Sequence, residues 1–303
     1  MISVIIVNWN TGKYLKNCIE SLLAVKETII SSIIIVDNDS TDDSLQLINK
    51  QNPNIQIIEQ KYNLGFSKAC DIAFKYVGTK YVLFLNPDTI VKEGVIDTLL
   101  LLMEANQNIG IVGPQLINEH NIVQRSCSKR PTFISYILHI NKIDRIISNL
   151  GYKMTNWDHL SNRYVDHVIG AFYLVKSELY SKLSGFDERY FLFMEDLDFS
   201  LKVKQYGYEV YYCADVKSLH YGSRSIKLHQ EKYLISYKSK IIFAKQYFGS
   251  IQYYSILTTI ILHLPLFIIM KLFAFKEFSI LSHIRQYIQL MSWLIKSFIK
   301  KIT

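Results

Sequence analysis

Residues 81–89 read YVLFLNPDT, an apolar run that stops at one carboxylate, Asp88. Buried parallel strands have continuous apolar sequences, and in open α/β sheets ligands bind beyond the carboxyl ends of the strands. This position makes Asp88 a candidate metal ligand. The structural alternative is a plain turn, in which Asn86 sets up the bend, Pro87 fixes φ and Asp88 bonds to nearby backbone.

The amino-terminal residues show strands and helices in alternation. An apolar strand over residues 3–7 precedes a polar loop, and apolar residues then recur at helical spacing over residues 14–22. A second strand over residues 33–36 leads into a polar cluster, a helix is expected to begin at Leu45, and a third strand covers residues 55–58. Such alternation predicts a parallel, doubly wound sheet.

The polar cluster after the second strand divides into two groups. Ser40, Thr41 and Asp42 are predicted to cap the next helix, because short polar side chains are good N-caps. Asp37 and Asp39 remain, and their carboxylates can accept hydrogen bonds from a ribose or from the imide of a nucleobase.

The sequence contains neither of two common phosphate-binding loops that would hold the phosphates of a bound nucleotide. No Gly-x-Gly-x-x-Gly follows the first strand and no P-loop sequence occurs, although Gly65 allows backbone to approach a ligand closely. A divalent cation on Asp88 would serve instead, because Mg²⁺ or Mn²⁺ is typically held by one or two carboxylates plus phosphate oxygens.

An acidic cluster, Glu195, Asp196 and Asp198, opens an expected helix after the aromatic stretch 185–191. Acidic residues in a first turn complement the helix dipole, which is the structural explanation. A carboxylate at a helix start beside an aromatic wall is also a suitable general base for an acceptor hydroxyl.

His220 follows an apolar-aromatic strand expected over residues 210–213. An isolated histidine is more often a structural residue than a ligand, and this interpretation is given to His139, His167 and His263.

Seven short motifs recur in a fixed order along about the first three quarters of the chain, which is far more specific than any one of them. They are Val7-Asn8-Trp9-Asn10, Val36-Asp37-Asn38-Asp39-Ser40-Thr41-Asp42, Asn63-Leu64-Gly65-Phe66, Leu85-Asn86-Pro87-Asp88-Thr89, Gly185-Phe186-Asp187-Glu188, Met194-Glu195-Asp196-Leu197-Asp198 and His220-Tyr221-Gly222. In these motifs the chain resembles the inverting nucleotide-sugar glycosyltransferases of family 2, and most of all their rhamnosyltransferase branch. It departs from them at Lys68 and Asp71, where such enzymes often carry small residues and an Asn.

The resemblance implies an α/β GT-A fold with a mostly parallel central sheet, and a metal-dependent inverting transfer of rhamnose from dTDP-rhamnose to a lipid-linked surface polysaccharide. It makes Asp196 the catalytic base, with Glu195 as an orienting residue, and Asp88 and His220 the ligands of Mg²⁺ or Mn²⁺. The implied substrate contacts are Asn8, Asn10, Asp37, Asp39, Asn63, Gly65, Phe66, Asn86, Asp198 and Arg224.

Three other functions stay open. A UDP-hexose or UDP-N-acetylhexosamine transferase would have the same fold. A nucleotidyltransferase would need a Gly-rich loop with a basic residue after the first strand, which this sequence lacks. A non-catalytic nucleotide-sugar-binding module would not need Asp196.

The sequence predicts a catalytic domain over residues 1–245 and a helical, membrane-associating region over residues 246–303. Residues 217–303 hold 13 Lys and Arg against 2 Asp and Glu, which suggests an anionic partner. Residues 256–275 are apolar but interrupted by Pro265, and an interfacial or re-entrant hairpin is expected there.

From Ile280 onward, apolar residues at helical spacing oppose basic ones, which predicts a helix lying in lipid headgroups. The alternative is a core-packing or dimerising helix. The four cysteines are scattered and no signal peptide is evident, so we expect a peripheral protein at the cytoplasmic face of the cell membrane. No nucleic-acid motif is found, and a nucleic-acid partner is not expected.

Overall fold

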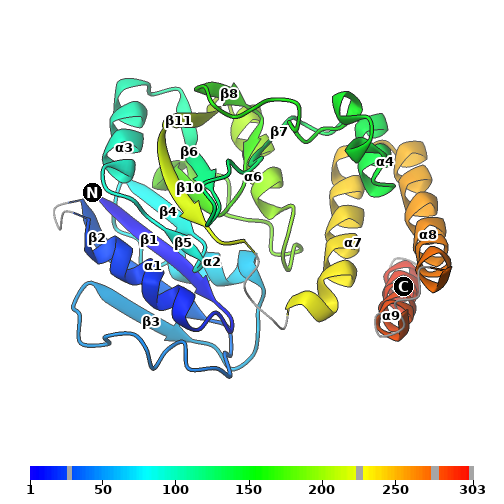
Figure 1. The fold of residues 1–303 in the computed structure, drawn as a ribbon, viewed down its shortest axis with the longest axis horizontal. Helices are drawn as coiled ribbons and strands as arrows, with labels where there is room; N and C mark the ends of the chain where they lie inside the picture. The colour runs from blue at the N-terminus through cyan, green and yellow to red at the C-terminus, as the bar shows by residue number, and fades with distance from the viewer. Residues whose placement is uncertain (26–28, 223–227, 274–279, 300–303) are drawn as a thin grey trace. The chain divides into compact units, whose positions relative to one another are not determined.

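The computed structural model describes residues 1–25, 29–222, 228–273 and 280–299 (Figure 1). Its contacts form two compact units. The first comprises Met1–Arg130, Tyr152–Phe191 and Glu195–Ile226, and the second comprises Pro131–Gly151, Leu192–Met194 and Lys227–Thr303. The division into domains after residue 245 stays a prediction.

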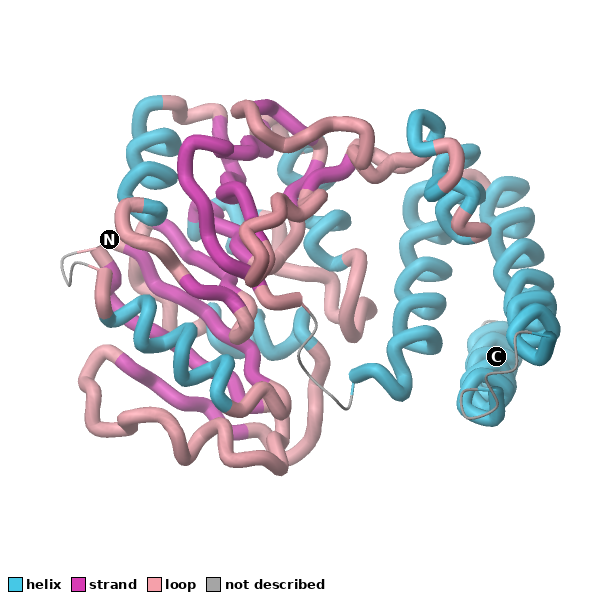
Figure 2. The backbone as a smooth tube through the Cα atoms, viewed as in Figure 1, coloured by secondary structure: helices cyan, strands magenta, loops and turns pink. Residues whose placement is uncertain are grey.

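The first unit is built on one sheet that contains nine strands among the described residues, in the order β3-β2-β1-β4-β10-β6-β11-β5, with β8 beside β11 (Figure 2). The strands are β1 (Ile2–Asn8), β2 (Ile30–Asp37), β3 (Ile55–Glu59), β4 (Tyr81–Leu85), β5 (Thr89–Ile90), β6 (Ile109–Ile117), β8 (Arg163–Val165), β10 (Phe172–Lys176) and β11 (Glu209–His220). Neighbours from β3 to β4 are parallel, as are β6 and β11, while β10 is antiparallel to both β4 and β6. The predicted α/β fold with a mostly parallel sheet is confirmed.

Helices cover both faces of this sheet. Side chains alternate along a strand, so Val4 and Ile6 of β1 join one apolar cluster and Ile5 joins the other. The first cluster is closed by α1 (Lys13–Leu23) and α3 (Val95–Ala105), and the second by α2 (Phe66–Phe74), α5 (Ser177–Lys182) and α6 (Glu195–Gln205). The loops at the ends of the strands carry the polar residues of interest.

The helix expected from Leu45 is wrong, because residues 41–50 form turns and bends. The polar residues predicted to cap it bond elsewhere: Asp42 Oδ2 accepts the backbone N–H of Gly12 at 2.9 Å. Further along, Asn49 and Asn52 each accept a backbone N–H two residues on. Such local side-chain bonds offer the backbone an alternative to a helix.

The second unit is helical. It contains α4 (Phe133–Ile140), the short 3₁₀ turns η1 (Ile143–Arg145) and η2 (Ser148–Leu150), α7 (Leu228–Tyr247), α8 (Ser250–Phe273) and α9 (Ile280–Ile299). The hairpin expected within residues 256–275 is wrong, since α8 continues through Pro265 as one helix to Phe273. None of the helices described here combines the length and the apolar character that crossing a membrane requires.

The apolar residues of α9 are divided between buried and exposed positions. Leu290 and Leu294 are buried, and Gln286 Oε1 accepts the backbone N–H of Leu234 in α7 at 3.1 Å. Ile288 and Ile295, in contrast, are 61% and 55% exposed. Part of the predicted apolar face therefore packs inside the unit, and part is left uncovered.

Candidate functional site

The sheet brings Asp88 and His220 together from opposite parts of the sequence. β5 begins at Thr89 and pairs with the end of β11, where the register sets Thr89 opposite His220. Asp88 Oδ1 lies 3.4 Å from His220 Nε2, and both residues are buried. Strand β11 is longer than expected, so His220 is its last residue and not part of a following loop.

Gln124 fixes the orientation of the His220 ring. Its Nε2 donates to the backbone carbonyl of His220 at 2.7 Å, which turns its Oε1 toward His220 Nδ1 at 2.8 Å. An amide oxygen can only accept, so Nδ1 carries a proton, and in the neutral form of the ring Nε2 presents its lone pair. This tautomer is the one that binds metals through Nε2.

The Asp88–His220 pair fits a divalent cation. Nε2 of His220 is buried and has no hydrogen-bond partner among the described residues. A lone pair and a carboxylate oxygen that face each other at this distance are satisfied by a cation between them. No group of three or more His, Cys, Asp or Glu with metal-site geometry occurs in the described part of the chain. The remaining coordination would come from water and diphosphate oxygens, as Mg²⁺ commonly requires.

A hydrogen-bond network joins the ends of β1 and β2. Asn8 is fully buried and its Nδ2 donates to Asp37 Oδ1 at 2.7 Å and to Ser40 Oγ at 3.0 Å. The other oxygen of Asp37 accepts the Ser40 backbone N–H at 2.9 Å. Both carboxylate oxygens of Asp37 therefore hold the loop in shape.

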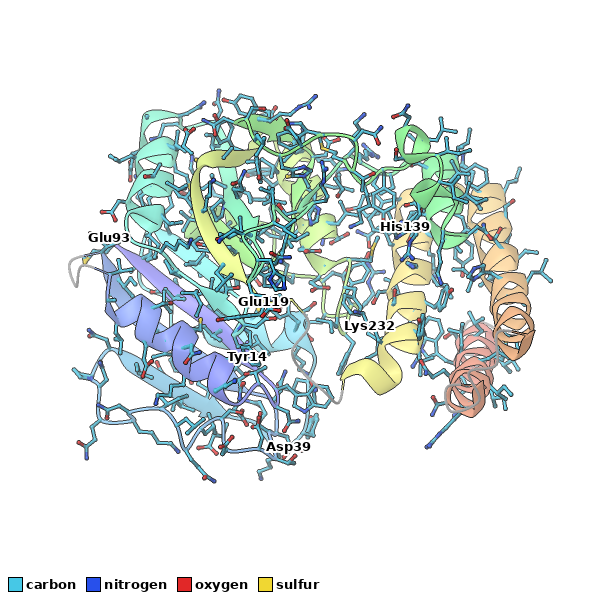
Figure 3. All side chains as sticks on the ribbon, viewed as in Figure 1. Tyr14, Asp39, Glu93, Glu119, His139 and Lys232 are labelled. Atoms are coloured by element: carbon cyan, nitrogen blue, oxygen red, sulfur yellow. The ribbon has the colours of Figure 1, made fainter. Side chains whose placement is uncertain are left out.

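Asn10 and Asp39 lie further out in the same network. Asn10 Oδ1 accepts the backbone N–H of Thr41 at 2.8 Å. Asp39 is exposed and has a positive φ of 61°, which is uncommon outside Gly and Asn or Asp (Figure 3). Of the two predicted nucleoside-binding carboxylates, Asp39 is the one that faces solvent.

The NLGF motif packs against the segment that follows Gly185. Gly65 has a φ of 83°, and a Cβ there would collide with the carbonyl oxygen of Phe191. That carbonyl accepts the backbone N–H of Phe66 at 2.7 Å, while Asn63 Oδ1 accepts the N–H of Gly65 at 2.9 Å. The close backbone approach that needs glycine is thus made to protein, and the predicted ligand contacts of these residues stay predictions.

Asp71, one of the departures from the family pattern, has a structural partner. Its Oδ1 accepts the hydroxyl of Tyr180 at 2.6 Å, which ties α2 to α5. Burial raises the pKa of Asp71 to about 6, against the lowering effect of the Tyr180 hydroxyl and the Phe186 N–H.

Asp196 is held by three partners at the start of α6. Its Oδ2 accepts the backbone N–H of Gly170 at 2.8 Å and lies 3.2 Å from His167 Nε2. Its Oδ1 accepts the backbone N–H of Leu197 at 2.8 Å. Burial alone would raise the pKa of Asp196, but His167, the Gly170 N–H and the charge of Lys153 together lower it to about 2.

The two acidic neighbours of Asp196 are more deeply enclosed. Glu195 is buried, and burial followed by the charge of Asp196 raises its pKa well above the ordinary value. Asp198 is fully buried and pairs with Lys202 at 2.8 Å. A substrate contact by Asp198 would require that pair to open. Asp196 is the member of this cluster that combines an ionised carboxylate with partial exposure, 18% of its side chain.

A short backbone path connects the carboxylates. The N–H of Asn86 donates to the carbonyl of Ala171 at 3.0 Å, and the same carbonyl accepts Thr89 Oγ1 at 3.3 Å. The residue before it, Gly170, is the one that bonds Asp196. The turn that carries Asp88 and the carboxylate of Asp196 are therefore held by two consecutive residues.

Sequence reasoning missed Gln124 and gave His167 only a structural role. Both lie in segments without clear periodicity, and their partners are 96 and 29 positions away, at His220 and Asp196. Arg224, the predicted diphosphate contact, lies outside the described residues.

Residues 3–180, more than half of the chain, match the family described as Glycosyl transferase family 2. The chain belongs to this family. It is 26% identical over 258 residues to the N-acetylglucosaminyl-diphospho-decaprenol L-rhamnosyltransferase of Mycobacterium tuberculosis (strain ATCC 25618 / H37Rv), covering 80% of this chain and 83% of that protein. It is 29% identical over 236 residues to the rhamnosyltransferase WbbL of Escherichia coli (strain K12), covering 73% and 84%.

Solved structures confirm the GT-A fold of this glycosyltransferase. S. aureus TarS aligns with a TM-score of 0.52 at 18% identity, over 80% of this chain and 39% of TarS. The mannosyltransferase PcManGT from Pyrobaculum calidifontis, solved with GDP-Man and Mn²⁺, aligns with a TM-score of 0.55 at 17% identity, over 85% and 68%. At these identities the likeness concerns the fold alone.

The site predicts that Gln124 controls metal affinity in this family 2 enzyme. Gln124→Leu should weaken Mn²⁺ binding in the presence of dTDP or UDP by about tenfold or more, because partners that orient a metal-binding histidine typically have effects of this size. Asp88→Ala should abolish it. Isothermal titration calorimetry and Mn²⁺ paramagnetic resonance measure both without any turnover.

The matched control is Gln115→Leu. Gln115 is also buried, and its Nε2 donates to the backbone carbonyl of His159 instead of His220. Equal Mn²⁺ affinity in the Gln124 variant and wild type would contradict the assigned tautomer.

Proposed function

We propose that this glycosyltransferase is an inverting rhamnosyltransferase that uses dTDP-rhamnose and a lipid-linked glycan acceptor. Two of its relatives are named rhamnosyltransferases, and the name of one specifies an N-acetylglucosaminyl-diphospho-decaprenol acceptor. Each alignment covers more than two thirds of this chain and more than two thirds of the relative, which supports proposing the same reaction for this protein.

One observation carries the mechanism: the turn that presents Asp88 and the carboxylate of Asp196 are fixed by consecutive residues, Ala171 and Gly170. Glycosyl transfer needs charge neutralisation at the leaving group and a base at the acceptor, on either side of the anomeric carbon. Asp88 with His220 supports the first requirement, and Asp196 supports the second.

At the donor side, Asp88 and His220 would hold Mg²⁺ or Mn²⁺, which supplies positive charge against the leaving diphosphate. Mn²⁺ in the PcManGT complex and UDP in a TarS complex support this choice of ligands. Asp39 is the exposed member of the loop network and Asn10 is half-buried, and both would contact the nucleoside. Asp37 would support them from inside the loop.

At the acceptor side, Asp196 takes the proton of the attacking hydroxyl. As the acceptor oxygen forms its bond to the anomeric carbon, the bond from that carbon to the diphosphate oxygen breaks, and the configuration inverts. Glu195 stays protonated beside it, since its raised pKa favours the neutral form. Two neighbouring carboxyl groups with pKa values moved in opposite directions are a recurring arrangement in acid–base catalysis.

The helical unit is proposed to bind the cytoplasmic face of the cell membrane, where a lipid-linked acceptor is found. Exposed apolar residues on α8 and α9 support this proposal, among them Ile251, Leu262, Ile288 and Ile295. Basic charge in the same region, 13 Lys and Arg against 2 Asp and Glu over residues 217–303, would add attraction to anionic lipids.

The first test is a panel of nucleotide sugars, with dTDP-rhamnose, UDP-glucose, UDP-galactose and UDP-N-acetylglucosamine. We expect dTDP-rhamnose to give the largest thermal shift and the fastest hydrolysis, both lost in EDTA. Asp196→Asn should reduce transfer about a hundredfold or more while donor binding stays close to wild type. Glu93→Gln, which changes an exposed carboxyl of the first unit, is the control.

Three results would contradict parts of this proposal. If the enzyme prefers a UDP-sugar, the proposed donor dTDP-rhamnose is wrong, whereas the proposed inverting transfer is unaffected. Turnover of Asp196→Asn within a few-fold of wild type would remove Asp196 as the base, and binding without any transfer or hydrolysis would favour a non-catalytic module.

The second test concerns the membrane. The double change Ile288→Ser and Ile295→Ser should release the full-length protein from vesicles that contain phosphatidylglycerol, as measured by sedimentation, and salt should weaken wild-type binding. Leu101→Ser is the matched control, because Leu101 is 70% exposed on α3 of the other unit. If wild type ignores the vesicles and the double change converts a dimer into a monomer, the exposed stripe is a dimer interface.

A further inference from the structure

His167 and Ser128 face each other across a short antiparallel ladder. β7 (Cys127–Ser128) pairs with β9 (His167–Val168), and the register sets Ser128 directly opposite His167. Ser128 Oγ lies 2.8 Å from His167 Nδ1, and at the other side of the ring His167 Nε2 lies 3.2 Å from Asp196 Oδ2. The ring therefore bridges a buried hydroxyl and the carboxylate assigned as the base.

These Ser, His and Asp contacts differ from a hydrolytic triad. Ser128 is fully buried and His167 is 2% exposed, whereas a nucleophile needs access to its substrate. In the triad the serine also faces Nε2 and the carboxylate faces Nδ1, and here the two are reversed. Ser128 thus holds the ring, and the carboxylate is the group at the partly exposed end.

The hydroxyl of Ser128 allows His167 to exist in two charge states. A hydroxyl rotates, so it can donate to Nδ1 or accept from it. When Ser128 donates, His167 is neutral and its one proton is on Nε2, toward Asp196. When Ser128 accepts, His167 carries protons on both nitrogens and a positive charge.

The charge of His167 matters because it acts directly on Asp196. Burial would raise the pKa of Asp196, and the largest opposing effect is the charge of His167. Other ionisable groups around Asp196 and its neighbours include Lys153, Tyr173, Glu195, Asp198, Cys70, Arg189 and Lys202. Burial raises the pKa of Tyr173 and of Glu195, so both favour the neutral form.

We propose that His167, held by Ser128, is a positioning residue that fixes Asp196 Oδ2 together with the Gly170 N–H. This inference rests on the proposed role of Asp196 in transfer. Gly170 supports the same geometry, since a Cβ at that position would lie 3.4 Å from Asp196 Oδ2 and 3.3 Å from its Cβ.

The experiment compares full-length wild type with His167→Gln and His167→Leu, using the donor selected by the nucleotide-sugar panel and a synthetic lipid-diphosphate acceptor. Values of kcat and KM are measured at one fixed pH. His167→Gln keeps a side-chain N–H donor, so kcat should stay close to wild type. His167→Leu should lower kcat about tenfold, the effect of one hydrogen bond to a charged group, with KM for the donor unchanged.

Two controls separate this role from folding. His139 of the helical unit is labelled in Figure 3. His139→Gln removes another His–Asp contact, His139 Nδ1 to Asp144 Oδ2 at 2.7 Å, and should leave kcat unchanged. In an Asp196→Asn background, His167→Leu should cause no further loss. Thermal unfolding verifies that each variant is folded.

A readout without turnover is ¹³C NMR of the Asp196 carboxyl, assigned with Asp196→Asn. At about pH 4, the ordinary midpoint for Asp, it should remain ionised in wild type and be partly protonated in His167→Leu. An unchanged carboxyl titration or a wild-type kcat in His167→Leu would overturn the inference, while an inactive Asp196→Asn keeps the proposed function. An active Asp196→Asn would instead overturn the proposed base itself.

Discussion

The backbone of two residues, Gly170 and Ala171, holds the candidate site together. The Ala171 carbonyl accepts the N–H of Asn86 and the hydroxyl of Thr89, which pins the turn at the end of β4 on both sides. The N–H of Gly170 fixes Asp196 at the start of α6. Because β10 follows directly and lies between β4 and β6, the sheet sets the spacing between the donor and acceptor sides. Any shift of this segment would move both carboxylates at once.

The local parts of this arrangement could be predicted from sequence. The apolar run before Asp88 is the buried strand β4, and the turn after it has the bond from Thr89 N–H to the Asn86 carbonyl at 3.1 Å. The turn and ligand interpretations therefore describe the same geometry, since the turn is what presents Asp88. The same holds for α6, where sequence spacing alone placed Asp196 in the first helical turn.

The parts that depend on distant contacts could not be predicted. Gln124 fixes the proton of His220 from 96 positions away, and Ser128 meets His167 only because two short strands pair. The expected helix after β2 failed for a related reason, since Asp42 bonds to Gly12 in the preceding loop. Residue type and spacing identify candidates, but tertiary pairing decides which group each ring nitrogen of these histidines faces.

The most direct test of this account is a crystal structure of the full chain with dTDP and Mn²⁺. The account predicts one cation bound by Asp88 and by His220 Nε2 at about 2.1 Å, the ordinary distance for such small divalent ions. Gln124 should still accept from His220 Nδ1, and the remaining ligands should be diphosphate oxygens and water. A cation bound elsewhere, or His220 Nε2 left outside its coordination shell with nucleotide present, would contradict the central claim.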